Sequence, residues 1–418
     1  MVKIITEFPP ALSKIRTEAL HLARPLWQEI DNIAEENTIK VLNAYRKYQV
    51  SDYHFRTTTG YGYGDAGRKK LEEVWAAIFG GERALVRTQF VSGTHALATV
   101  LFGILRPGDE LLAVTGAPYD TMQTVIGHKV PVMAPGSLKE FGVSYTELPM
   151  VDGKVDIPGL QQAINAKTRI ALIQRSRGYS MRSSLSVAEI TAICREIKTI
   201  KADCICFVDN CYGEFVENIE PTASGADIIA GSLIKNPGGG LAPTGGYIVG
   251  KDELIEAAAH RLTAPGIADE LGASLCDNRL LFQGLYLAPH ITAQALKGAV
   301  FAAEFFSLLG YEIFPQLHEP RSDIIQAIRL GSPEKMVAFC RGLQKYSPVD
   351  SFVRPEPSPM PGYSDSIIMA AGTFVQGASI ELSADGPIRP PYVIYLQGGL
   401  TLEHVIIGVM GAAAEMIR

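Results

Sequence analysis

The first fifty residues repeat apolar side chains at helical spacing. Ile15, Ala19, Leu22 and Leu26 fall on one face of a helix, and charged residues fill the other faces. This pattern predicts a long helical arm ahead of the first strand. Such an arm either reaches a partner subunit or packs on its own core, and the pattern leaves both readings open. Four glycines between residues 60 and 67 then predict a loop.

From residue 84 onward, short apolar runs alternate with amphipathic helical stretches. This alternation is typical of a largely parallel sheet with helices on both faces, and such sheets bind ligands at the carboxyl ends of their strands. The predicted strands are 84–91, 110–114, 170–174, 204–208, 228–229 and 247–249. The predicted helices are 69–79, 95–105, 122–127, 157–166 and 186–198.

The last third of the chain changes in pattern. A long helical stretch at 277–309 contains Pro289, which we expect to kink or split the helix. Five prolines between 347 and 363 predict a long loop. The fold class is therefore α/β, with a mostly parallel sheet in a large domain and a smaller α+β domain at the C-terminus. We expect a helical arm and inter-subunit loop over 1–68, the large domain over 69–290 and the small domain over 291–418. The strand-like pieces of the small domain are 312–314, 324–329, 367–371, 379–382 and 393–396, and its helices are 334–345 and a last one from 402.

Composition narrows the class of protein. Hydrophobic residues make up 47% of the 418 residues and charged residues 20%, which excludes a polar, disordered chain. The net charge of −6 leaves no basic excess for nucleic acid or an anionic membrane. No apolar run reaches the ~18–20 residues of a membrane helix, and the N-terminus lacks the apolar core of a signal peptide. The six cysteines show no metal-ligand spacing and no disulfide framework, so we expect reduced thiols, no metal site and a cytoplasmic location.

Two predicted strand ends carry groups that suit an anion and a flat ring. Around Ser92, Gly93 and Thr94 a strand turns into a helix, where backbone N–H groups, two hydroxyls and the positive end of the helix dipole meet. Such a turn is either an anion site or an ordinary N-cap. Tyr119 follows the next strand, and its ring either stacks on a ligand or fills a turn.

Two later strand ends carry a carboxylate and an amine. Asp209 directly follows a buried apolar strand, so its charge needs a metal or a cation such as a protonated pyridine nitrogen. Tyr212 lies three residues further on. Lys235 lies in a glycine-flanked apolar segment, shortly after Ser232, and is a candidate for Schiff-base chemistry. An anion clamp, a stacking ring, an aspartate and a lysine together meet the needs of pyridoxal phosphate (PLP).

Seven segments also carry a resemblance to a known family. They are TGYGYGDAGR (59–68), SGTHA (92–96), GAPYDT (116–121), QRSRGY (174–179), VDNCYGEF (208–215), GSLIKNPGGG (231–240) and YLQGGLT (395–401). The chain resembles the fold-type I PLP enzymes of cysteine and methionine metabolism, which have the aspartate aminotransferase-like fold. Within them it resembles the methionine gamma-lyase-like branch, described as the aluminium-resistance or cystathionine beta-lyase-like family.

The resemblance implies roles for the matching residues. Lys235 and Tyr119 are the catalytic residues: Lys235 binds the cofactor aldehyde and moves protons, while Tyr119 stacks on the ring. Asp209 pairs with the pyridinium nitrogen, and Tyr212 donates to the 3-oxygen of the ring. The phosphate contacts come from Ser92, Gly93, Thr94 and Ser232, and from Tyr61 or Tyr63 of the partner subunit.

The partner of the substrate α-carboxylate is less directly implied. Arg389 is the expected residue, and Arg177 and Arg182 are rivals, because this chain has Tyr395 before LQGG where better-known lyases have an arginine.

The resemblance further implies a reaction and an assembly. The expected activity is β- or γ-elimination of a sulfur-containing amino acid to a thiol, an oxo acid and ammonia. The alternatives are an aminotransferase and a β/γ-replacement enzyme. Lys235 argues against a non-catalytic protein of this fold, and no GxGxxG follows a strand to suggest a nicotinamide enzyme. The expected assembly is a homodimer with shared sites that pairs into a homotetramer.

Overall fold

The computed structural model describes residues 8–128, 135–275 and 278–417. Three features of the sequence lie outside them: the N-terminal residues 1–7, which bear on a signal peptide, Cys276, and the predicted start of the long helix at residue 277. The other five cysteines are buried and free. No described helix is long and apolar enough to cross a lipid bilayer.

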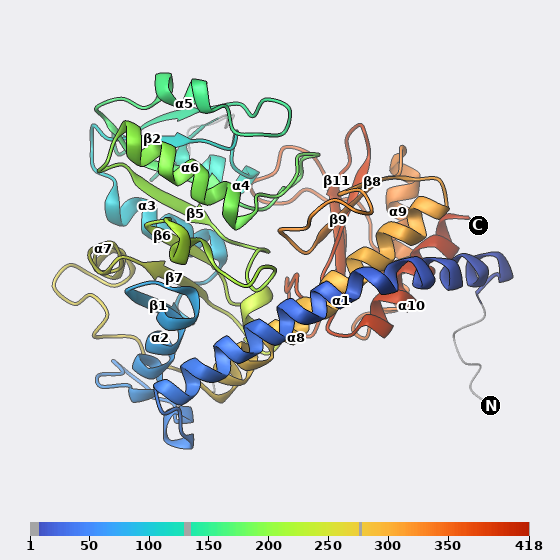
Figure 1. Cartoon of the computed structure of the whole chain (residues 1–418), viewed down its shortest axis with the longest axis horizontal. Helices are drawn as coiled ribbons and strands as arrows, with labels where there is room; N and C mark the ends of the chain where they lie inside the picture. Colours follow the sequence, from blue (N-terminus) through green and yellow to red (C-terminus); the bar gives the residue numbers. More distant parts are fainter. Residues whose placement is uncertain (1–7, 129–134, 276–277, 418) are drawn as a thin grey trace.

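A seven-stranded sheet forms the larger part of the molecule (Figure 1). Its strand order is β1-β7-β6-β5-β4-β2-β3. β2 to β6 run parallel, whereas β7 is antiparallel to both β6 and β1. The predicted mostly parallel sheet is therefore confirmed. The strands are β1 Arg83–Arg87, β2 Glu110–Ala113, β3 Ser144–Glu147, β4 Thr168–Gln174, β5 Ile205–Asp209, β6 Ile228–Ser232 and β7 Gly246–Gly250.

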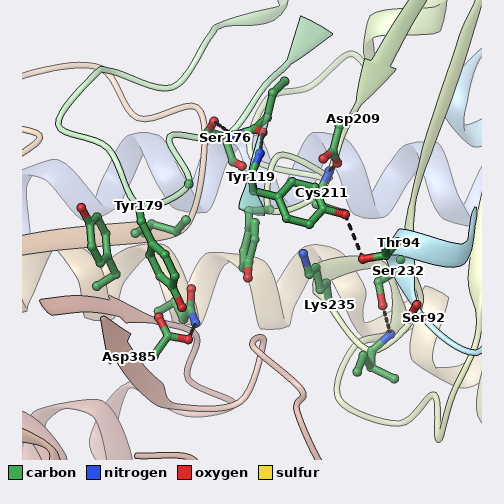
Figure 2. A pocket seen from close by; sticks show the side chains of 18 of the residues that line it. Ser92, Thr94, Tyr119, Ser176, Tyr179, Asp209, Cys211, Ser232, Lys235 and Asp385 are labelled. Carbon is green, nitrogen blue, oxygen red and sulfur yellow. Dashed lines mark hydrogen bonds between the residues drawn. The ribbon is translucent and has the colours of Figure 1, made fainter. Parts of the chain in front are cut away.

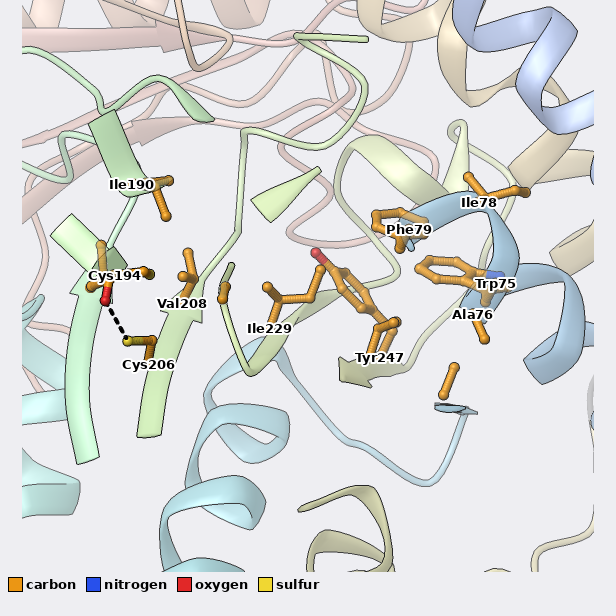
Figure 3. Close-up of a cluster of buried hydrophobic side chains, with 14 of the residues drawn as sticks. Trp75, Ala76, Ile78, Phe79, Ile190, Cys194, Cys206, Val208, Ile229 and Tyr247 are labelled. Carbon is orange, nitrogen blue, oxygen red and sulfur yellow. Dashed lines mark hydrogen bonds between the residues drawn. The ribbon is translucent and has the colours of Figure 1, made fainter. Parts of the chain in front are cut away.

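Helices cover both faces of this sheet. One face packs against α3, α4 and α7, and the other against α2, α5, α6, the first half of α8 and the end of α1. On the second face Trp75 stacks on Phe79 with ring centroids 4.8 Å apart, and Tyr247 packs beside them (Figure 3). This core holds the central strands in place and leaves their carboxyl ends free for a site. The helices are α1 Pro10–Lys47, α2 Ala66–Phe79, α3 Gly93–Ile104, α4 Asp120–Ile126, α5 Ile157–Ala163, α6 Val187–Ile200, α7 Asp252–Leu262 and α8 Asn278–Leu308.

A five-stranded antiparallel sheet forms the second core. Its order is β10-β11-β12-β9-β8, and α9, α10 and the second half of α8 pack on it. The predicted small α+β unit is therefore confirmed, but its strand at 379–382 is wrong, because the pairing segment is Ser383–Pro387. The remaining elements are β8 Glu312–Phe314, β9 Ile325–Arg329, α9 Pro333–Lys345, β10 Ile367–Ala370, β11 Ser383–Pro387, β12 Val393–Gln397 and α10 Leu402–Met416.

The helices α1 and α8 run side by side across both cores (Figure 1). Leu12 and Ala19 of α1 belong to the second core, and Val41 and Ala44 belong to the first. The arm thus packs on its own chain. α8 is continuous through Pro289, so the predicted split does not occur: burial of the helix in both cores outweighs the hydrogen bond that proline cannot make. The predicted border at residue 290 falls inside this helix.

Candidate active site

A cavity of about 290 Å³ lies between the carboxyl ends of the parallel strands of the first sheet and one face of the second sheet. Its walls come from the ends of β4, β5 and β6 on one side and from β9, β10, β11 and β12 on the other. The structure brings together here eight of the residues that the sequence singled out: Ser92, Gly93, Thr94, Tyr119, Asp209, Tyr212, Ser232 and Lys235.

The start of α3 forms one end of the cavity. The Oγ of Ser92 accepts a hydrogen bond from the backbone N–H of His95 at 3.1 Å, which caps the helix. A Cβ atom on Gly93 would lie 3.1 Å from the Cβ of Ser232, so glycine lets the helix start approach β6 closely. Ser92, Thr94 and Ser232 thus gather hydroxyl groups beside the positive end of a helix, as an anion requires (Figure 2).

Tyr119 extends over the middle of the cavity from the loop after β2. Its hydroxyl lies 2.9 Å from the Oγ1 of Thr94, and its backbone N–H donates to the Oε1 of Gln174 at 3.0 Å. These two contacts fix both ends of the residue. Burial raises the pKa of the phenol, so it is neutral at physiological pH.

Asp209 and Lys235 lie deeper, at the ends of two neighbouring strands. The backbone N–H of Cys211 donates to the Oδ1 of Asp209 at 3.1 Å. Burial raises the pKa of Asp209, while the charge of Lys235 acts to lower it. Burial alone would lower the pKa of Lys235, but acidic neighbours that include Cys211 and Asp209 outweigh burial and raise it. Each of the two groups therefore stabilises the charged form of the other in a buried site.

The turn after Asp209 presents Tyr212 to the lysine. The Nζ of Lys235 lies 3.8 Å from the centroid of the Tyr212 ring. Tyr212 has a φ of +72°, a left-handed conformation that costs energy for a residue other than glycine. Asn236 holds this turn, because its Nδ2 donates to the carbonyls of Tyr212 and Glu214, both at 3.0 Å.

The three arginines lie beside this cavity instead of in it. Arg177, Arg182 and Arg389 line an adjoining cavity of about 310 Å³. It shares Tyr119, Gln174, Gly178 and Tyr179 with the first. Arg389 is partly exposed and pairs with Asp365 at 2.9 Å. Arg177 is buried near Asp323, and its Nε has no hydrogen-bond partner among the described residues. Burial lowers the pKa of Arg182 to about 10, so it remains charged at neutral pH.

Tyr61 and Tyr63 lie on the surface of the chain and do not line either cavity. Their side chains are 70% and 67% exposed, and their rings lie 5.7 Å apart on the glycine-rich loop before α2. Both rings are therefore free to contact another molecule.

The wall of the cavity that the second sheet supplies could not be recognised in the sequence. Asp385, Tyr395 and Gln397 of this sheet line the cavity, with Tyr363 from the loop before β10, and Tyr179 packs beside Tyr395 from the segment that follows β4. Tyr179, Tyr395 and Gln397 belong to segments that carried the resemblance, but no role was assigned to them. An aspartate flanked by alanine and glycine was the available signal for Asp385.

The comparisons with known proteins agree with this architecture. The chain shares its fold with the PLP-dependent protein YhfS from Escherichia coli, at a TM-score of 0.59 and 16% identity over 91% of this chain and 96% of the other. The fold is thus that of the fold-type I PLP-dependent enzymes. The methionine gamma-lyase family model matches residues 12–417, and the chain belongs to this family.

Three other proteins are more similar to the chain. The uncharacterized protein YnbB of Bacillus subtilis is 53% identical and covers 94% of this chain and 93% of its own length. A proposed cystathionine beta-lyase involved in aluminium resistance from Listeria monocytogenes has a TM-score of 0.94, with 51% identity, over 97% of this chain and 100% of the other. A carbon–sulfur lyase involved in aluminium resistance from Clostridium novyi has a TM-score of 0.93, with 46% identity, over 97% and 96%.

Proposed function

We propose that the protein is a PLP-dependent carbon–sulfur lyase that converts a sulfur-containing amino acid and water into a thiol, an oxo acid and ammonia. One observation carries this proposal: a single cavity holds a buried lysine amine, a buried carboxylate, a fixed tyrosine ring and a hydroxyl-lined helix start. The membership of the methionine gamma-lyase family supports the choice of elimination.

The described residues fit PLP in three respects. The helix start at Ser92–Thr94, with Ser232, suits the phosphate. Asp209 is a buried carboxylate whose raised pKa marks a need for a cation, and a protonated ring nitrogen is one. Lys235 offers the amine that the aldehyde of this cofactor requires.

The residues of the chain then have distinct tasks. Bound PLP supplies an electron sink for the charge left at the substrate α-carbon. The Nζ of Lys235, in its neutral form, takes the proton from that carbon. Tyr119 holds its ring over the centre of the site, and Thr94 keeps its hydroxyl in place. Sulfur leaves as the thiol, and water releases the oxo acid and ammonia.

The adjoining cavity supports a place for the substrate carboxylate. Arg177, Arg182 and Arg389 line it, against one carboxylate, Asp120. Arg389 reaches the substrate by exchanging its pairing with Asp365 for the α-carboxylate, and the buried Nε of Arg177 offers a second donor.

We also propose that the site is completed by a second copy of the chain. The phosphate end contains hydroxyls and backbone N–H groups, and none of the arginines among the described residues lines this cavity. Tyr61 or Tyr63 of the partner subunit supplies further phosphate contacts in a homodimer, and dimers pair into a tetramer. The cytoplasmic location stays a prediction.

The first test is the substitution Lys235→Ala. Wild-type protein with PLP is expected to gain a visible absorbance band and to release ammonia and oxo acid from one of cystathionine, methionine, cysteine or homocysteine without an added acceptor. The variant should lose the band and at least about 10³-fold of the rate, because its proton carrier is gone.

Three other results of this assay would contradict the proposed lyase activity. Ammonia-free turnover that needs an oxo-acid acceptor identifies an aminotransferase. Turnover that needs a second nucleophile identifies a replacement enzyme. A wild-type protein that stays colourless with PLP contradicts the cofactor itself.

A further inference from the structure

The wall of the cavity opposite the phosphate end carries a carboxylate that the proposed reaction does not use. Asp385 lies in the middle of β11, where it pairs with Met369 of β10 and Tyr395 of β12. Its side chain is partly buried and lines the cavity. Figure 2 shows Asp385 and Tyr179 on one side of Lys235, and Thr94 and Ser232 on the other. Asp385 therefore faces the part of the site that is left for the substrate.

Neutral groups hold this carboxylate. Tyr179 donates a hydrogen bond to it, and the Nε2 of Gln397 donates to its Oδ2 at 3.4 Å. Asp385 makes no ion pair within the described residues, and Lys235 is the cation that acts on it through space. Burial raises the pKa of Asp385 to about 6, so the group is mostly ionised at neutral pH. A partly buried carboxylate whose partners are neutral lacks the counter-charge that would stabilise its ionised form.

The parts that every amino-acid substrate shares do not meet this need. The reacting α-amino group belongs at Lys235, because that is where the cofactor aldehyde is held. The α-carboxylate is repelled by Asp385 and is drawn to the arginines of the adjoining cavity. The rest of the wall beside Asp385 is formed by Met369, Tyr363 and Tyr395, which bear no charge at neutral pH. The group that Asp385 faces is thus the side chain of the substrate.

We propose that Asp385 binds a positively charged group in the substrate side chain, so that the enzyme selects sulfur amino acids that carry a second ammonium group. This inference rests on the proposed function and names the substrate class of the same site. Asp385 acts as a specificity-determining residue: it touches the substrate away from the bond that breaks. A neutral side chain of equal length leaves the carboxylate without its partner and binds less tightly.

A matched pair of substrates tests the proposal. S-(2-aminoethyl)-L-cysteine and S-propyl-L-cysteine have equal length and differ by an ammonium group in place of a methyl group. Wild-type protein with PLP should have the higher kcat/KM for the aminoethyl compound. Asp385→Asn should lower this preference by about 10- to 100-fold, because a charged hydrogen bond is replaced by a neutral one. An unchanged preference overturns the proposal.

The control variant removes a carboxylate from the same sheet without touching the cavity. Glu312 on β8 is exposed and pairs with Arg329 at 2.9 Å. Glu312→Gln should keep the wild-type preference. A loss of preference in this variant as large as in Asp385→Asn overturns the proposal, because it traces the preference to net charge.

A binding measurement separates this inference from the proposed function. L-ornithine and L-norleucine are also of equal length and lack a sulfur leaving group. In calorimetric titration the wild-type protein with PLP should bind ornithine more tightly, and Asp385→Asn should erase the difference. Equal binding of the two by wild-type protein overturns the role of Asp385. A preference for ornithine without ammonia release from any sulfur amino acid upholds that role and contradicts the lyase instead.

Discussion

Asp209 and Asp385 are two carboxylates that line one cavity, and they differ in the groups that surround them. Asp209 accepts a backbone hydrogen bond from Cys211 and lies beside Lys235, deep at the end of β5. Asp385 rests on Tyr179 and Gln397, on the opposite wall. In the two proposals, Asp209 pairs with a cation of the protein or the cofactor, whereas Asp385 pairs with an ammonium group of the substrate. Under the two proposals, one carboxylate serves catalysis and the other serves substrate selection.

The pH dependence of substrate preference follows from Asp385. Its carboxyl has a pKa of about 6, and the protonated form carries no charge to attract an ammonium group. The preference for S-(2-aminoethyl)-L-cysteine over S-propyl-L-cysteine should therefore be full above this pH and decline as the pH falls through about 6. The ratio of the two kcat/KM values, measured from pH 5 to 8 in steps of about half a unit, checks this prediction.

The other groups around Asp385 do not disturb this ratio. Tyr179, Tyr363 and Tyr395 have raised pKa values and stay neutral over that range. Lys235 and Tyr212 also face the carboxylate, but they act on both substrates alike. In Asp385→Asn the ratio should not vary with pH, and a slope that persists there would contradict the assignment.

Single residues could be predicted where local sequence explains their surroundings. Asp209 and Lys235 stand out because each follows or interrupts an apolar run at a strand end. The role of Asp385 could not be found, because the predicted strand ended three residues too early and left it in a loop. The arginines were identifiable as charges, but their place in an adjoining cavity depends on how two distant segments fold together.

At the scale of elements, one buried side chain anchors the long helix α1 to the first sheet. The Nδ2 of Asn37 donates to the carbonyl of Phe215 at 3.2 Å and to that of Glu217 at 3.0 Å. Asn37 is fully buried. Both carbonyls belong to the segment that follows the turn of Tyr212, so α1 holds the backbone just after a residue that lines the cavity.

Replacing this anchor should destabilise the fold. Asn37→Ala is expected to lower the free energy of unfolding by about 1–3 kcal/mol, because one buried and one partly buried carbonyl lose their donor. Asn43→Ala is the matched control: it lies exposed on the same helix and gains the same helix propensity. Its effect should stay within about 0.5 kcal/mol. Urea unfolding of both variants decides, and equal stabilities would show that the anchor contributes nothing.

The order of elements was largely readable from the chain, whereas their pairing was not. Apolar runs at 110–114, 170–174 and 204–208 became β2, β4 and β5. The antiparallel direction of β7 could not be read, because an apolar run of this length looks the same in either direction. β3 was missed because its residues, Ser144–Glu147, are mostly polar and only partly buried at the edge of the sheet.

At the scale of the whole molecule, the exposed rings of Tyr61 and Tyr63 make the shared site testable. In a mixed dimer, one subunit carries Lys235→Ala and the other carries Tyr61→Ala with Tyr63→Ala. One of its two sites then has every defect and the other has none. Each variant alone should be nearly inactive, and the mixed dimer, purified with two different tags, should recover about half of the wild-type rate.

Two results would contradict the shared site. Full activity of the double tyrosine variant would remove its role at the phosphate. An inactive mixed dimer would place all these residues in a site built from one chain.

The paired helices α1 and α8 have a mechanical consequence. Both helices contribute side chains to the two cores, and together they stiffen the molecule along its length. A hinge motion that separates the two sheets would have to bend both helices at once, so a wide opening would cost much free energy. Entry of a substrate is then left to the irregular segments that carry Tyr179, Met360 and Tyr363. We therefore expect these segments to move when a substrate enters, while the two sheets keep their relative position.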